Sequence, residues 1–165
     1  MGLLGATWAI VGFSALILSA LYRLTPLALE AFTFDLQWYH WVSMIVWIIF
    51  MVYSEAYKGF HKAFSPRAAA RAKHLRDNPT LLHVVFAPLF IMCFFHTTKK
   101  RKIVSYCLTT GIVLLIMLVH QLVQPWRGVV DAGVVLGLGL GLLSFWWWVA
   151  QVFSGKIGDV SPEVP

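Results

Sequence analysis

The sequence has few charged residues for its length. Only 12% of its 165 residues are Asp, Glu, Lys or Arg, whereas 59% are hydrophobic. A soluble domain carries about 25% charged residues, so water is the wrong solvent for most of this surface. The composition therefore excludes an ordinary water-soluble domain and indicates an integral membrane protein.

Cysteines and catalytic motifs are also scarce. The two cysteines, Cys93 and Cys107, lie inside apolar runs and match no disulfide or metal-binding spacing. The sequence contains no P-loop, no GxSxG, no HExxH and no CxxCH motif. We therefore predict no class of enzyme and no cofactor from motifs. We also expect no nucleic-acid partner, because no recognisable nucleic-acid-binding module accompanies the basic clusters.

Apolar runs of membrane-spanning length are what the sequence has in their place. A helix needs about 18 apolar residues to be read as a transmembrane candidate. Four segments meet or approach this length: residues 3–22, 38–57, 103–123 and 128–150. We predict an all-α integral membrane protein. Its single transmembrane domain, residues 1–165, is a compact bundle of four helices with a short polar tail at 151–165.

A fifth apolar segment, residues 79–96, allows two interpretations. Its 18 residues would rise about 27 Å as a helix, which is nearly the thickness of the hydrocarbon core. Pro88 interrupts it, however, and favours a re-entrant segment that other parts of the protein must cover. The segment is thus either re-entrant or a fifth span.

The stretch before this segment is basic and rich in alanine. Ser65 is a candidate N-cap with Pro66 at the first helical position, and Asn78-Pro79 ends the pattern. We expect a basic interfacial helix at about 65–77, lying along the membrane surface.

The placement of lysine and arginine predicts the orientation. If residues 79–96 are re-entrant, eleven of the thirteen Lys and Arg residues lie on one side, and only Arg23 and Arg127 lie on the other. Five spans would divide them seven to six. Because basic residues concentrate in cytoplasmic loops, four spans are favoured, with both termini cytoplasmic. We expect the protein in the inner (plasma) membrane of a bacterium.

Small residues follow one ridge of the last span. Gly133, Gly137 and Gly141 occur every four residues, and Ser144 continues the same face. Such a ridge allows a second helix to approach closely. The partner is a helix of the same chain, a second copy, or a different protein. The run Trp146–Trp148 then marks a membrane interface, where tryptophan is enriched.

Polar residues within the spans are few, and each is a candidate for function. The predicted lining of a transport pathway consists of Glu55, His120, Gln124 and Asp131. Structural explanations compete at two of these positions. Glu55 has the spacing to pair with Lys58, and Asp131 has the spacing to pair with Arg127.

The histidines suggest a redox alternative. His83 and His96 both lie on segment 79–96, and a membrane haem b needs two imidazoles that face each other. Thirteen residues of ideal helix would turn the second histidine about 140° away from the first. The pair would therefore not share a face, and haem b stays a minor alternative.

Clusters of basic residues also suggest contacts with lipid. Anionic phospholipid headgroups bind basic residues beside helix ends. The candidates are Lys99, Lys100, Arg101, Lys102 and Arg127. Orientation by the positive-inside rule explains the same residues without a bound lipid.

Taken together, these features predict a small polytopic membrane protein without a catalytic motif. The leading hypothesis is a homo-oligomeric channel or simple carrier for protons or small cations, since four helices leave little room for a central pathway within one copy. The alternatives are a non-catalytic accessory subunit that binds a larger membrane complex and anionic lipid, and a haem b or quinone redox subunit.

Overall fold

The computed structural model describes residues 1–156 and 160–164, and these residues contain helices but no strands. In chain order the helical elements are α1 (Gly2–Glu30), η1 (Ala31–Thr33), α2 (Trp38–Met51), η2 (Val52–Phe64), α3 (Ser65–Asp77), α4 (Leu81–Val85), α5 (Ala87–Ile91), α6 (Lys99–Val119) and α7 (Trp126–Phe153). η1 is a short 3₁₀ turn and η2 is wound as a π-helix.

Four helical stretches are long and apolar enough to cross a membrane: Gly2–Thr33, Trp38–Asp77, Lys99–Val119 and Trp126–Phe153. The prediction of an all-helical protein with four such helices is confirmed. The second stretch is much longer than expected, 40 residues, because the chain continues from α2 through η2 into α3 without a break.

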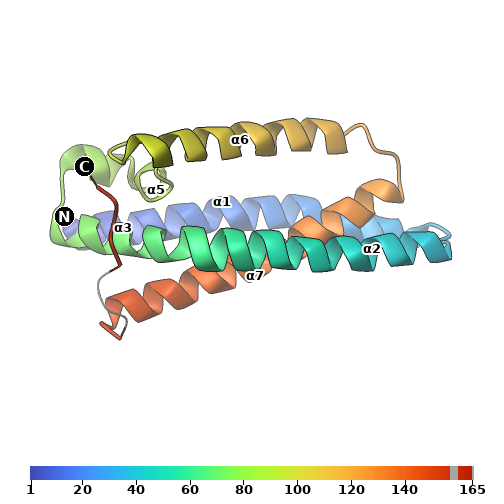
Figure 1. Cartoon of the computed structure of the whole chain (residues 1–165), viewed down its shortest axis with the longest axis horizontal. Coiled ribbons are helices and arrows are strands. Elements are labelled where there is room, and N and C mark those ends of the chain that lie inside the picture. The colour runs from blue at the N-terminus through green and yellow to red at the C-terminus, as the bar shows by residue number, and fades with distance from the viewer. Residues whose placement is uncertain (157–159, 165) are drawn as a thin grey trace.

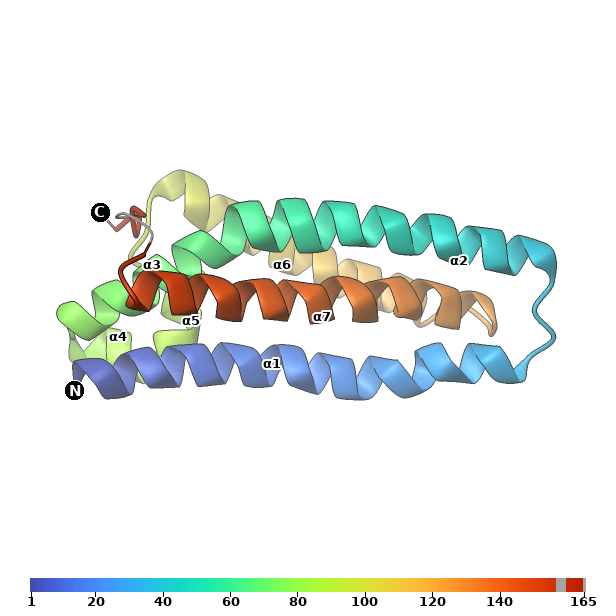
Figure 2. The same cartoon turned by 90° about the horizontal axis from the view of Figure 1, so that it is seen from below.

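The spanning helices run side by side along the long axis of the molecule (Figure 1). α7 packs between α1 and α2, and the continuation of α2 through η2 and α3 stays in contact with it (Figure 2). Both termini, the α4–α5 segment and the start of α6 lie at one end of the bundle, which we call the terminal end (Figure 1). The loops at residues 34–37 and 120–125 lie at the other end.

The helix predicted at about 65–77 is present as α3, but it continues η2 rather than standing apart, and one side of it is buried in the bundle. Ser65 is buried within a continuing helix and caps nothing, since the preceding Phe64 is itself helical. Ala68, Ala72 and Leu75 are fully buried against the other helices. The physical reason is the small size of alanine, which lets α3 pack closely against α1 in place of lying on a lipid surface.

The small residues of α1 make this close approach feasible. A Cβ atom at Gly5 would meet the side chains of Leu75 and Val84, and one at Gly12 would lie 2.5 Å from Cγ of Pro88. At Gly2 the added atom would collide with the backbone carbonyl of Arg76. The absence of side chains at these glycines therefore allows α1 to pack closely against α3 and the α4–α5 segment.

An aromatic core fills the terminal end. The ring of Phe13 lies 4.8 Å from that of Phe64 and 4.9 Å from that of Phe145. Phe90 of α5 is fully buried in the same cluster. The core therefore lies where α1, α3, α5 and α7 converge, and not midway along the bundle.

Residues 79–96, all of which the structure describes, form two five-residue helices rather than a fifth spanning helix. The helix breaks at Phe86 because the ring of Pro88 removes a hydrogen-bond donor. The segment enters the bundle beside α1 and returns to the terminal end through left-handed backbone at Cys93 and His96. One side of the segment is buried, at His83, Ala87, Phe90 and Ile91, whereas Leu81, Leu82 and Val85 are exposed, and we call it the re-entrant segment.

α6 differs from the other long helices in its surroundings. None of its residues, Lys99 to Val119, is buried, although all are described. Its first two turns are held to the terminal end, where Ser105 donates a hydrogen bond to the carbonyl of Met92 at 2.9 Å. Beyond these turns the helix stands apart from the bundle (Figure 1).

Candidate functional site

The glycine ridge of α7 faces α2 and η2 of the same chain. A Cβ atom at Gly137 would lie 2.5 Å from Oε2 of Glu55, and one at Gly141 would lie 2.5 Å from Cδ2 of Phe60. At Gly133 it would collide with the indole of Trp47. We call this line of contact between α7 and α2–η2 the seam. It occupies the ridge within the chain, so a second copy cannot use the same face.

The π-helical winding of η2 determines which side chains reach the seam. In a π-helix each N–H bonds to the carbonyl five residues earlier, so residues five apart lie close to one face. Glu55 and Phe60 have this spacing, and they meet Gly137 and Gly141 on α7. π-Helical segments are rare and often occur at functional sites, so η2 is a candidate functional segment.

Glu55 is the carboxyl group within the seam. Its Oε2 atom is buried and accepts no hydrogen bond from any described residue. The ion pair with Lys58 that the spacing allowed is not formed, since Lys58 instead lies 4.7 Å above the ring of Tyr53. This oxygen is thus held against the backbone of α7 without a hydrogen-bond partner among the described residues.

Asp131 lies on α7, toward the end of the bundle opposite the terminal end. It is 2% exposed, and its Oδ2 atom is 3.7 Å from Nε of Arg127. The i, i+4 pair that the sequence allowed is therefore present. At that distance it is an ion pair without a hydrogen bond, and both atoms lack any other partner among the described residues.

His61 is a residue of the seam that the sequence analysis did not select. One ring nitrogen, Nδ1, lies 2.8 Å from Oγ of Ser144, and the backbone carbonyl of His61 accepts a hydrogen bond from Nε1 of Trp148 at 3.0 Å. The only signal in the sequence was Ser144, whose position on the glycine ridge indicated a close neighbour but not which one.

Two titratable groups lie in the seam, and a third, Asp131, lies on α7 about 120° around the helix from Gly137. Asp131 belongs to α7, Glu55 lies opposite Gly137, and His61 lies opposite Ser144. With a rise of 1.5 Å per residue, the levels of these groups along α7 are separated by about 9 Å and about 10 Å. The indole of Trp47 lies opposite Gly133, between the levels of Asp131 and Glu55. Its Nε1 donates a hydrogen bond to the carbonyl of Val130 at 3.0 Å.

The remaining two predicted lining residues lie away from Glu55. His120 is exposed at the end of α6, and its Nδ1 atom is 3.0 Å from the carbonyl of Ile116. Gln124 donates to the carbonyl of Leu27 at 3.2 Å and accepts from the amide of Gly128 at 3.1 Å. Gln124 thus joins the end of α1 to the start of α7, which is a structural role.

The predicted lipid-contacting residues are divided by the fold. Lys99, Lys100 and Lys102 are exposed at the start of α6. Arg101 turns inward and forms two hydrogen bonds with Glu163, at 2.6 and 3.1 Å. Arg127 lies at the opposite end of the bundle.

His83 and His96 meet because their segment is not a continuous helix. Their ring centroids are 4.6 Å apart, and His83 also stacks on Phe90 at 4.5 Å. They are neighbours within one hairpin and do not face each other from two helices across a bundle. The described residues include no group of three or more side chains suited to a metal ion. This arrangement does not favour the haem alternative.

Arg71 is the second residue that the sequence analysis missed. Its side chain is fully buried, and its guanidinium donates to the carbonyls of Phe90, Phe95, His96 and Pro162 at 2.7 to 3.1 Å. It also lies 4.0 Å above the ring of Phe90. Four backbone acceptors from two distant segments cannot be inferred from a basic residue in an alanine-rich helix.

Comparison with protein-family models, with curated proteins and with solved structures found no match to this chain.

Proposed function

We propose that the protein conducts protons, or small cations, across the membrane along the seam. The observation that carries the proposal is Glu55, a carboxyl group within a spanning helix whose buried oxygen has no partner among the described residues. An ionisable residue inside a membrane helix is costly and marks ion or proton pathways. Nothing in the packing of the seam requires a carboxyl group at this position.

The proposed pathway follows Glu55 and His61 of the seam and begins at Asp131 on α7, outside the glycine ridge. Asp131 receives the ion at one end, Glu55 holds it midway, and His61 passes it to the terminal end. Separations of about 9 to 10 Å along α7 exceed direct hydrogen-bond reach, so the proposal includes water molecules that bridge these groups.

The orientation is part of the same proposal. Both termini and the basic segments before and after residues 79–96 share the terminal end (Figure 1). By the positive-inside rule this end is cytoplasmic, in the inner (plasma) membrane of a bacterium. Asp131 then lies toward the outer side.

The proposal also includes a homo-oligomer, but its interface is not the glycine ridge of α7. The glycine ridge is filled by α2 and η2, whereas α6 is uncovered beyond its first two turns. A homo-oligomer would therefore assemble through α6. The same uncovered helix favours the second candidate, an accessory subunit that docks through α6 onto a larger membrane complex.

A flux measurement tests the pathway. The purified protein in liposomes with an imposed pH gradient is expected to dissipate the gradient, and Glu55→Gln is expected to reduce the flux to that of empty liposomes. Asp35→Asn is the matched control, because Asp35 is an exposed carboxylate between η1 and α2. Equal flux for the native protein and Glu55→Gln would overturn the proposal. Absence of flux together with co-purification of a partner would favour the accessory subunit.

A further inference from the structure

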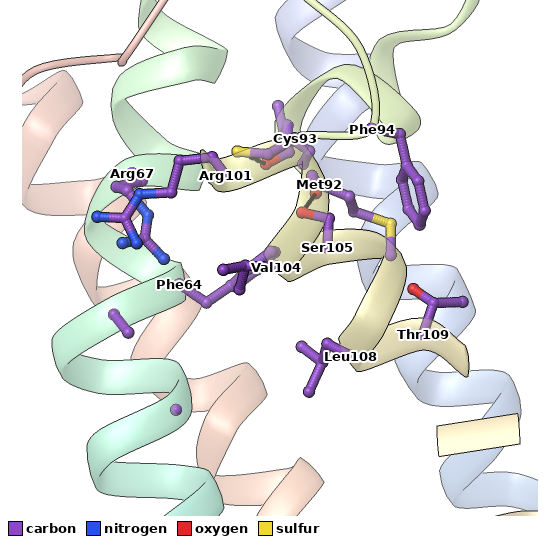
Figure 3. Close-up of a pocket in the computed structure, with 13 residues that line it drawn as sticks. Phe64, Arg67, Met92, Cys93, Phe94, Arg101, Val104, Ser105, Leu108 and Thr109 are labelled. Atoms are coloured by element: carbon purple, nitrogen blue, oxygen red, sulfur yellow. Dashed lines mark hydrogen bonds between the residues drawn. The ribbon is translucent and has the colours of Figure 1, made fainter. Parts of the chain in front are cut away.

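A cavity opens at the terminal end, between the start of α6, the junction of η2 and α3, and the tip of the re-entrant segment (Figure 3). Its volume of about 270 Å³ is close to the lower limit of sites for small molecules, which is about 300 Å³. No part of the proposed proton pathway lines it.

Two arginines lie together at one end of this cavity. Figure 3 shows the guanidinium groups of Arg67, from α3, and Arg101, from α6, side by side. Arg101 is paired with Glu163, but Arg67 forms no hydrogen bond or ion pair with any described residue. The two guanidinium groups outnumber the single carboxylate of Glu163, so the site carries an excess positive charge.

The walls of the cavity below the arginines are apolar. Phe64, Met92, Val104 and Leu108 line it from three different elements. Because α6 stands apart from the bundle beyond its first turns, the apolar wall continues directly onto the uncovered face of α6. Charge at one end and an apolar wall that reaches the membrane-facing surface match a molecule with an anionic head and a hydrocarbon tail.

We propose that this cavity binds one anionic phospholipid. The headgroup phosphate lies against Arg67 and Arg101, since guanidinium groups bind phosphate by paired, charge-assisted hydrogen bonds. An acyl chain lies against Val104 and Leu108 and continues along α6. Glu163 competes with the phosphate for Arg101, so the C-terminal tail weakens lipid binding.

The test is native mass spectrometry of the full chain in detergent, with phosphatidylglycerol added as the lipid. We expect one bound lipid per chain, with weaker binding of phosphatidylcholine. Arg67→Gln is expected to lower the affinity at least about tenfold, since hydrogen bonds to charged groups contribute about 1.5–3 kcal/mol. Lys102→Gln removes the same charge from an exposed neighbour and is expected to leave the affinity unchanged. Glu163→Gln is expected to raise it.

A second pair of variants tests the apolar wall. Leu108→Trp fills the cavity and is expected to reduce binding, whereas Leu114→Trp adds the same bulk to an exposed part of α6 and is not. Binding of glycerol phosphate as tight as that of phosphatidylglycerol would show a phosphate site without a tail and overturn the proposal. Equal losses in Arg67→Gln and Lys102→Gln would show surface attraction alone and also overturn it. Thermal stability without lipid is expected to be the same in Arg67→Gln and the native protein, which separates lost binding from lost folding.

Discussion

Two neighbouring glycines of α7 differ sharply in their surroundings. A Cβ atom at Gly141 would lie 2.5 Å from Cδ2 of Phe60, 2.6 Å from its Cγ and 2.9 Å from its Cε2. A Cβ atom at Gly139 would meet nothing within 4 Å. Replacing each by alanine therefore makes the same chemical change on the same helix, but only one of the two changes affects the seam.

The size of the difference follows from two opposing effects. Alanine favours a helix over glycine by up to about 1 kcal/mol, and this gain is common to both positions. Only Gly141→Ala forces a ring to move, and overpacking of this kind costs about 1–3 kcal/mol. The ring cannot move freely, because Phe60 packs edge-on against Phe64 at 5.6 Å. We expect Gly141→Ala to be less stable than Gly139→Ala by about 1–3 kcal/mol.

Unfolding by sodium dodecyl sulfate in mixed micelles, followed by near-ultraviolet circular dichroism, measures this difference. The double variant Gly141→Ala with Phe60→Leu should recover part of the lost stability, because the smaller side chain relieves the contact. If Gly139→Ala and Gly141→Ala unfold at the same detergent fraction, α7 does not pack against η2 through this ridge and the seam is wrong.

Three further predictions concern the terminal end. Replacing Arg71 by Met leaves four carbonyls without their donor, so the buried Cys93 should react with a maleimide at least about tenfold faster; an unchanged rate would contradict the role of Arg71. Burial, with the nearby positive charges of His96 and Arg71, lowers the pKa of His83. The neutral form of His83 therefore stabilises the hairpin at pH values above the ordinary histidine pKa of about 6.5. The stability of the hairpin falls as the pH drops from there through the lowered pKa of His83. Relative to the rate for the unfolded chain at the same pH, which corrects for the falling thiolate fraction, labelling of Cys93 should accelerate below a pH of about 6.5 in the native protein and not in His83→Phe. The hydrogen bonds from Arg101 lower the pKa of Glu163, so the tail should stay bound above pH of about 4.5 and detach as the pH falls further, which a spin label on the tail would report as increased mobility. A label that stays immobile throughout acidification would contradict this pair.

Much of the architecture could be predicted because it depends on local properties of the chain. Apolar runs of sufficient length predict membrane helices wherever they occur, and Pro88 predicts an interruption without reference to any neighbour. The pair Arg127–Asp131 follows from a spacing of four residues on one helix. The ridge that begins at Gly133 follows from the same periodicity.

The errors concern segments whose surroundings are set by distant parts of the chain. The stretch at 65–77 has the composition of a surface helix, but the glycines of α1 create a place where its alanines fit. His83 and His96 meet because the hairpin folds back on itself, which no helical periodicity describes. The π-helical winding of η2 likewise has no local signature, although it directs Glu55 toward α7.

The sequence by itself determined the all-helical, membrane-compatible class of the protein and the four apolar segments of spanning length. These follow from hydrophobicity, helical periodicity and proline, which act on each segment separately. Only the tertiary structure decided that the ridge of α7 meets η2, that Arg71 is buried and that Arg67 lies beside Arg101. Each of these contacts joins residues far apart in the chain. Their partners depend on how whole helices pack, and a single sequence does not specify this through local spacing.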